Sequence, residues 1–307
     1  MPATGFQKPE TVAPRGKHLS DMRIPAATTR LALRFLLVPL LLLPFLEAPA
    51  RAADALSVSD PLDLGFRQMY NLDFEEAHNT FREWQKFHPH DPFGLTGEAA
   101  AYLFEEFDRL GVLQSELFVD REKFEERNKT VPDPALRASF GQALERSDQL
   151  ADAILARSPK DENALFAKIL NLGLRADYLA LIEKRNVASL GRIKRAGQLA
   201  GRLLAENPEC YDAYLAVGVE NYMLSLKPAP VRWFLQLYGA ETDKNRGVKN
   251  LQLTAEKGHY LQPYARLLLA VAALRDQRRD EARALLLGLS QEFPRNRLYR
   301  REFSRLQ

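Results

Sequence analysis

A spacing of small, large and proline residues recurs along this chain, and it constrains the fold more than any other feature. Ala77 is followed four residues later by Phe81 and twelve residues later by Pro89. The spacing returns in full at Ala282, Leu286 and Pro294, and in part at Ala196, Ala200 and Pro208 and at Ser147, Ala151 and Pro159. A small residue lets two helices approach, a larger one a turn later fills the seam, and proline ends the helix. The spacing therefore predicts a row of packed helix pairs.

The first clear unit begins at Gly65, and a turn at 70–73 separates its two amphipathic helices. This helix–turn–helix pattern resembles the tetratricopeptide repeat family. The resemblance implies an all-α helical solenoid in which the first helix of each unit lines the concave face. The four prolines are 70, 49 and 86 residues apart, so we expect an irregular array with inserted helices and a loop near 120–134. Because no stretch alternates with period two, we predict no sheet.

Apolar periodicity and helix-stop residues also predict the individual helices. They are expected at 60–71, 74–87, 93–107, 136–157, 162–174, 177–186, 189–206, 210–225, 230–238, 244–257, 261–275, 279–291 and 296–305. A further resemblance covers residues 218–274, about a fifth of the chain. There a helix ending in S-L-x-P, a short apolar helix and a G-x-x-x-L helix are similar to the tetratricopeptide repeat protein 39 family. This resemblance implies a short helix, about Val231–Leu237, inserted between repeat helices.

The first 52 residues have the composition of a secretory signal. Scattered basic residues precede an unbroken apolar run of twelve residues, 35–46, and Ala50-Arg51-Ala52 follows it. This order predicts a signal peptide, 1–52, cleaved after Ala52, with Met22 as an alternative start. An uncleaved anchor is the other interpretation, although a span needs roughly 20 apolar residues. The remaining chain, 53–307, is predicted to be periplasmic or secreted, without a transmembrane span.

The positive net charge of the chain depends on this leader. The whole chain carries +3, but residues 1–52 hold seven Lys and Arg against three Asp and Glu, which leaves −1 for the rest. Basicity is therefore no argument for binding nucleic acid. The charge is also uneven, at −9 over 53–131 and +8 over 132–307. Either these are ordinary solvated helix faces, or they form a dipolar surface that orients a partner or a second copy.

Residues with catalytic or metal-binding chemistry are few. The G-x-S-x-G, H-E-x-x-H, S-x-x-K and glycine-rich phosphate-binding motifs are all absent from the sequence. One metal candidate is the group His78, His88, His90 and Asp91, but His78 lies nearly three helical turns from the others. Cys210 is the only cysteine and has no histidine nearby in sequence, so we expect a structural thiol. We therefore predict no enzyme, no cofactor and no metal.

Two groups of residues are candidates for contacting a partner. The first comprises large side chains on the first helices of the predicted units: Phe66, Met69, Tyr70, Phe104 and Tyr222. They either line a concave groove that takes a peptide or pack against inserted helices. The second is a basic cluster near the start of the 189–206 helix: Arg192, Lys194 and Arg195.

Three functions remain open from these residues. The predicted one is a protein-interaction scaffold without catalysis, because the repeat pattern is typical of binding modules and no catalytic motif is present. An alternative is an envelope assembly in which acidic and basic halves of neighbouring copies meet. A remote alternative is an enzyme on a helical toroid with a cleft of non-adjacent acids. The sequence does not identify the partner.

Overall fold

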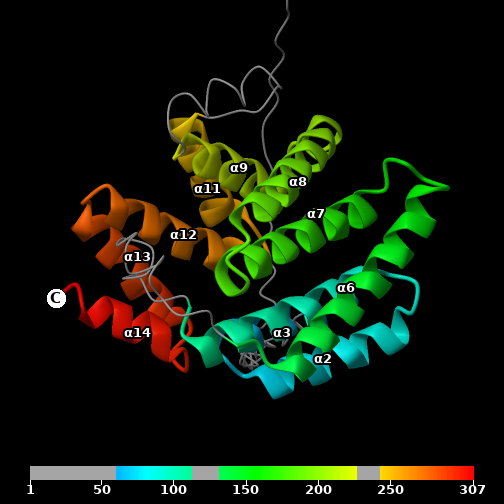
Figure 1. Ribbon diagram of the computed structural model, residues 1–307, viewed down its shortest axis with the longest axis horizontal. Coiled ribbons are helices and arrows are strands. Elements are labelled where there is room, and N and C mark those ends of the chain that lie inside the picture. Colours follow the sequence, from blue (N-terminus) through cyan, green and yellow to red (C-terminus); the bar gives the residue numbers. More distant parts are fainter. Residues whose placement is uncertain (1–59, 113–130, 227–242) are drawn as a thin grey trace, which may run out of the picture. The chain divides into compact units, whose positions relative to one another are not determined.

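The chain is all-α wherever its structure is described. The computed structural model describes residues 60–112, 131–226 and 243–307, which all belong to one compact unit, Ala53–Gln307. These residues form helices joined by short connections and contain no strand, which confirms the all-α prediction (Figure 1). The predicted signal peptide, most of the predicted loop 120–134 and the predicted inserted helix near Val231–Leu237 lie outside the described residues.

The helix bounds follow the predicted ones closely. Two of them, 74–87 and 244–257, match the prediction to the residue. The observed helices are α1 (Pro61–Tyr70), α2 (Phe74–Phe87), α3 (Phe93–Leu110), α6 (Pro134–Leu155), α7 (Glu162–Asp177), α8 (Asn186–Glu206), α9 (Tyr214–Ser225), α11 (Lys244–Lys257), α12 (Gln262–Arg275), α13 (Arg279–Glu292) and α14 (Arg297–Ser304). Four helices end two to four residues before a repeat proline, at Phe87, Leu155, Glu206 and Glu292. The proline stops therefore act as the spacing predicted.

The separate helix expected at 177–186 is wrong. Helix α7 continues to Asp177 and passes directly into a π-helical turn, Tyr178–Ile182. The chain then reverses through Lys184, whose φ of 56° is left-handed, and α8 begins at Asn186. Nothing in the local sequence breaks the helix at Asp177, so periodicity alone could not place this boundary. Single π turns inside helices are rare and occur frequently at functional sites.

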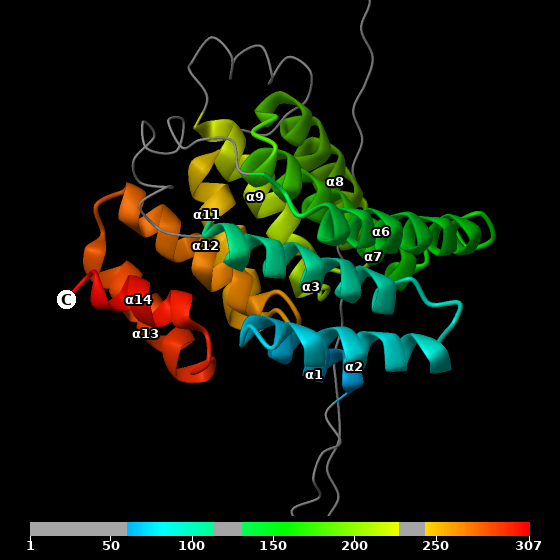
Figure 2. The same cartoon turned by 60° about the horizontal axis from the view of Figure 1, so that its bottom comes forward.

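Each helix packs against the next one along the chain. Helices α1 and α2, α3 and α6, α7 and α8, α9 and α11, and α12 and α13 form successive pairs, and α14 packs on α13. The first helices of neighbouring pairs also touch, with α3 between α1 and α7, and α7 against α9. Figures 1 and 2 show these pairs following one another through the colours of the sequence.

Phe81 shows how the repeat spacing works in three dimensions. The ring is fully buried and lies against Gly65 of α1 and Gly97 of α3. A Cβ added at Gly65 or Gly97 would lie 2.6 or 2.5 Å from this ring. The predicted seam residue is thus wedged between three helices, and both glycines are needed because any side chain there would collide with the ring.

The row of helices closes on itself, because its last members contact its first pair. Asn296 donates a 2.7 Å hydrogen bond from Nδ2 to the carbonyl of Tyr70, and the Tyr70 hydroxyl donates to the carbonyl of Tyr260 at 3.0 Å. The Phe293 ring lies 5.5 Å from the Tyr70 ring.

Acidic residues of the N-terminal half pair with basic residues of the C-terminal half at this closure. Arg295 pairs with Asp73, Arg297 with Asp108, and His259 with Asp63. The basic members are 60–71% exposed, so each pair contributes little to stability, typically about 0–1 kcal/mol. Part of the charge asymmetry is therefore used within one chain. Self-association through the two halves would need other charges.

Candidate ligand-binding cavity

All five predicted aromatic and Met residues are buried, and four of them pack together in the interior. Phe66, Met69, Tyr70 and Phe104 are 1–8% exposed. The structure brings them together with residues from the far end of the chain. Phe66 lies 4.9 Å from Tyr260, and Phe104 lies 5.6 Å from Tyr264, measured between ring centroids. The first helices α1 and α3 therefore bury these side chains against the C-terminal part, and a partner could reach them only if that packing opened.

The predicted basic cluster lies apart from the aromatic residues. Arg192 and Arg195 of α8 are exposed, and Lys194 is half-buried. On the same helix, Ser189, Ile193 and Ala196 face a cavity instead. These two sets lie on different faces of α8, so the structure does not join the basic cluster and the aromatic residues into one surface.

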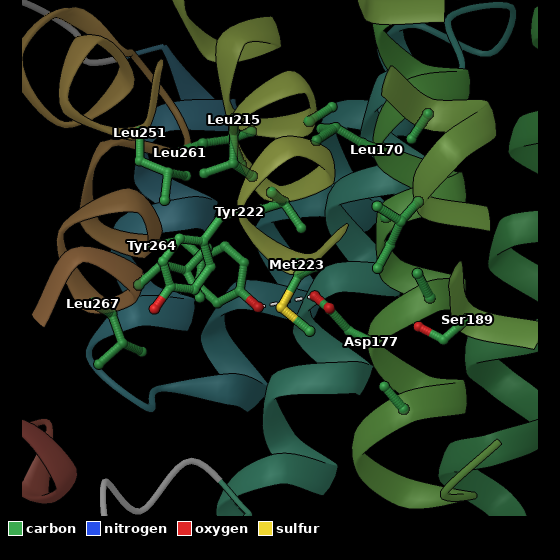
Figure 3. Close-up of a pocket in the computed structure, with 18 of the residues that line it drawn as sticks. Leu170, Asp177, Ser189, Leu215, Tyr222, Met223, Leu251, Leu261, Tyr264 and Leu267 are labelled. Atoms are coloured by element: carbon green, nitrogen blue, oxygen red, sulfur yellow. Dashed lines mark hydrogen bonds between the residues drawn. The ribbon is translucent and has the colours of Figure 1, made fainter. Parts of the chain in front are cut away.

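The fifth predicted residue, Tyr222, lines a cavity of about 240 Å³. The walls come from α7, the π turn, α8, α9 and α12 (Figure 3). Most of the lining is aliphatic, and several of these side chains are only half-buried although they belong to the interior face: Leu170, Leu181, Val219, Met223, Leu268 and Val271. Aromatic rings of the chain itself pack against α1 and α3, whereas α7, α9 and α12 leave this cavity between them.

A carboxylate and a phenol meet in the cavity wall. Asp177, at the junction of α7 and the π turn, accepts a 2.9 Å hydrogen bond at Oδ2 from the hydroxyl of Tyr264 on α12. Figure 3 shows the two side chains pointing toward one another beside Met223. Burial raises the pKa of Asp177 to about 6, although the hydrogen bond from Tyr264 works against this rise. Burial also raises the pKa of the Tyr264 hydroxyl, so the phenol remains the donor.

Two further polar side chains belong to the wall. Tyr222 is 6% exposed, and its hydroxyl has no hydrogen-bond partner in the described structure. Asp212, in the short 3₁₀ turn Tyr211–Ala213, is occupied by backbone groups, because His259, Tyr260 and Leu261 all donate their N–H to it at 2.9–3.1 Å. Arg275 also lines the cavity, but its side chain is exposed.

Sequence reasoning missed Asp177, Tyr264 and Asp212. Asp177 and Tyr264 are 87 residues apart, and neither belongs to a recognisable motif. The only local signal for Asp177 is a charged residue inside a largely apolar run, ILNLGLRADYLALI. That signal is weak, because Arg175 stands two residues earlier in the same run and such charges are equally typical of a solvated helix edge.

At pH 8, replacing Asp177 with asparagine is expected to raise the free energy of unfolding by about 1–3 kcal/mol. The folded-state pKa of about 6 lies above the ordinary 3.8, so the ionised carboxylate is less stable in the folded chain than in the unfolded one. This penalty is complete above the folded-state pKa and disappears below the ordinary value. Asparagine carries no such charge and still accepts from Tyr264. Urea unfolding at pH 8 and pH 5 measures the difference.

The matched control is Glu75→Gln, at an exposed carboxylate on α2. We expect this variant to change stability little at either pH. If Asp177→Asn gave the same change at pH 8 and pH 5, the carboxylate would not be carrying an unfavourable charge in the folded state.

Three residues of the predicted metal candidate, His78, His88 and Asp91, have ordinary structural contacts. His78 is buried beside Glu105 at 3.3 Å, and burial lowers its pKa to about 4. His88 stacks on the Trp84 ring, and the Asp91 carboxylate accepts from Asn163. Over the described ranges, no group of three or more His, Cys, Asp or Glu residues could hold a metal ion.

The single cysteine is not activated. Cys210 is half-buried at the turn before α9, and burial raises the pKa of its thiol to about 11. A thiol with a raised pKa is mostly protonated near neutral pH and is a poor nucleophile.

Comparison with protein-family models, with curated proteins and with solved structures gives no match for this chain. Within residues 60–112, 131–226 and 243–307, no helix has the length and apolar character to cross a bilayer. Because the comparisons give no match, the function of this chain follows only from its own residues and structure.

Proposed function

We propose that this chain is an exported, non-catalytic binding protein of the tetratricopeptide type, whose partner inserts an apolar group into the cavity between α7, α8, α9 and α12. One observation carries the proposal. Aromatic rings of the chain itself cover α1 and α3, whereas α7, α9 and α12 face a cavity of about 240 Å³. The recurring spacing of small, large and proline residues and the pairing of successive helices support the repeat class.

The cavity has the properties of an anchor pocket in a protein interface. Such pockets are concave, largely apolar and carry a few polar groups that orient the ligand. A partner's large apolar side chain that fills such a pocket supplies much of the binding energy. Since the lining includes half-buried Leu170, Val219 and Val271, an inserted group would remove further apolar surface from water.

We expect peptides selected on the purified chain from a random display library to bind through this cavity. Val219→Phe adds bulk to the cavity wall and is expected to weaken their binding by about tenfold or more. Arg192→Ala, on the exposed face of α8, serves as the control and is expected to leave binding within about twofold. Fluorescence anisotropy of labelled peptides measures both, with circular dichroism to verify that each variant is folded.

The opposite pattern would reject the proposed site. If selected peptides bound Val219→Phe as well as the parent chain and were lost on Arg192→Ala, the basic face of α8 would be the interaction surface. If no peptide bound the folded parent chain, the cavity would not be a peptide-binding site.

A further inference from the structure

The cavity described above has an uneven balance of charge. Among its lining residues are two carboxylates, Asp177 and Asp212, and one basic side chain, Arg275. Arg275 is exposed, so water and salt screen its charge. The inner wall is therefore aliphatic and acidic, which favours a ligand that is apolar and positively charged over one that is apolar and negatively charged.

The two carboxylates differ in how far their hydrogen-bonding capacity is used. Asp212 accepts three backbone N–H groups. Asp177 accepts one hydrogen bond, from the Tyr264 hydroxyl, and no basic side chain of the described residues pairs with it. An ionised carboxylate offers about four acceptor positions. Asp177 is also only half-buried although it lies in the cavity wall, so part of its surface remains open to a ligand.

Tyr222 adds a second unused polar group. Its side chain is more than nine-tenths buried, it lines the same cavity, and its hydroxyl has no partner in the described structure. A buried hydroxyl without a partner costs free energy, and this cost is recovered when a ligand supplies the missing hydrogen bond.

We propose, on the basis of the cavity site put forward under the proposed function, that the cavity selects an apolar group carrying a protonated amine, whose ammonium binds Asp177. The apolar body lies against the aliphatic wall of Leu170, Val219 and Val271. A hydrocarbon cavity of about 150 Å³ holds benzene, so about 240 Å³ is sufficient for a short alkyl or arylalkyl amine. The amine belongs either to a small molecule or to a side chain of the partner.

The pH dependence follows from Asp177 and the titratable groups around it. Tyr264 contacts Asp177 directly, and the other titratable or charged groups that line the same cavity are the Tyr222 hydroxyl, the Asp212 carboxylate and the exposed Arg275. Burial places the pKa of Asp177 at about 6, so a bound ammonium keeps its counter-ion at pH 7.5 and loses it at pH 5. Amine binding is therefore expected to weaken as the pH falls through 6.

Hexylamine, 1-hexanol and hexanoate test the proposal, because they share an alkyl body and differ in head group. Binding to the full chain is measured by isothermal titration calorimetry at pH 7.5 and pH 5. Hexylamine is expected to bind more tightly than either competitor at pH 7.5. Asp177→Asn is expected to reduce hexylamine affinity about tenfold or more while leaving 1-hexanol affinity unchanged. Glu75→Gln controls for the loss of a negative charge elsewhere.

The remaining outcomes separate this inference from the proposed function. If 1-hexanol or hexanoate bound as tightly as hexylamine, or if Asp177→Asn left hexylamine affinity unchanged, the inference of amine selection would be wrong. The proposal that the cavity binds an apolar group would be unaffected. If none of the three probes bound, or if Val219→Phe did not weaken their binding, both the amine proposal and the proposed cavity site would be wrong. Selected peptides that bind through the cavity without a basic residue in common would reject amine selection for the partner's side chain.

Discussion

Asp212→Ala is expected to lower the free energy of unfolding by about 3–5 kcal/mol, the largest effect of any single truncation considered for this chain. Asp212 is 7% exposed, and its Oδ1 accepts from the backbone of His259 and Leu261 while Oδ2 accepts from Tyr260. These three donors belong to the connection between α11 and α12. Alanine would leave all three without this acceptor, and the Leu261 bond is fully buried.

The effect should extend beyond the connection itself. The carbonyl of Tyr260 accepts from the Tyr70 hydroxyl, and the Tyr260 ring packs on Phe66 and Phe93. Asp212 therefore positions a segment that packs against α1 and α3. Amide hydrogen exchange should show faster exchange at Tyr260 and Leu261, and the loss of protection should reach α1.

Urea unfolding followed by circular dichroism at pH 7 measures the global effect. Asp212→Asn is the matched variant, because its Oδ1 can keep the two bonds to His259 and Leu261 while the side-chain amide loses the bond to Tyr260. An intermediate loss is expected for it. A midpoint for Asp212→Ala equal to that of the parent chain, with an unchanged slope, would show that water replaces the carboxylate without cost.

The second large effect is expected at Asn296, with a loss of about 2–4 kcal/mol on replacement by alanine. Its side chain has two roles. Oδ1 caps α14 by accepting from Leu298 at 3.0 Å, and Nδ2 donates to the carbonyl of Tyr70 at 2.7 Å. Asn296 is 3% exposed and Tyr70 is 2% exposed, so alanine removes a helix cap and leaves a buried carbonyl unpaired.

Asp161→Ala separates these two contributions. Asp161 caps α7 by accepting from Ala164 at 2.9 Å and makes no contact comparable to the bond between Asn296 and Tyr70. Asp161→Ala is expected to lower the free energy of unfolding by about 1 kcal/mol. Both variants are compared by urea unfolding at the same pH. If Asn296→Ala cost no more than Asp161→Ala, the bond from α14 to α1 would add nothing to stability.

These two residues show why the closure differs from ordinary repeat stacking. Neighbouring helix pairs hold each other through apolar seams such as the one around Phe81. The closure instead depends on single polar side chains that reach backbone groups of distant segments, 226 residues away in the case of Asn296 and Tyr70. Removing one such side chain leaves its partners buried and unpaired, which is why the expected costs are large.

The sequence by itself determined the helices and their stops. Ala77, Phe81 and Pro89 act over one or two turns, so their spacing carries the information for where a helix packs closely and where it ends. The same local rules placed α2 and α11 to the residue. They failed at Asp177, because a π turn continues the helical path without a glycine or proline to mark it.

Only the tertiary structure decided what the first helices face. Phe66, Tyr70 and Phe104 carry the same apolar pattern whether they line an open groove or a closed interior. Which of the two occurs depends on how the later helices pack, and here they bring Tyr260 and Phe293 against α1. The pairing of Asp177 with Tyr264 arises in the same way. No local pattern encodes it, because the two residues meet only after several helix pairs have been stacked.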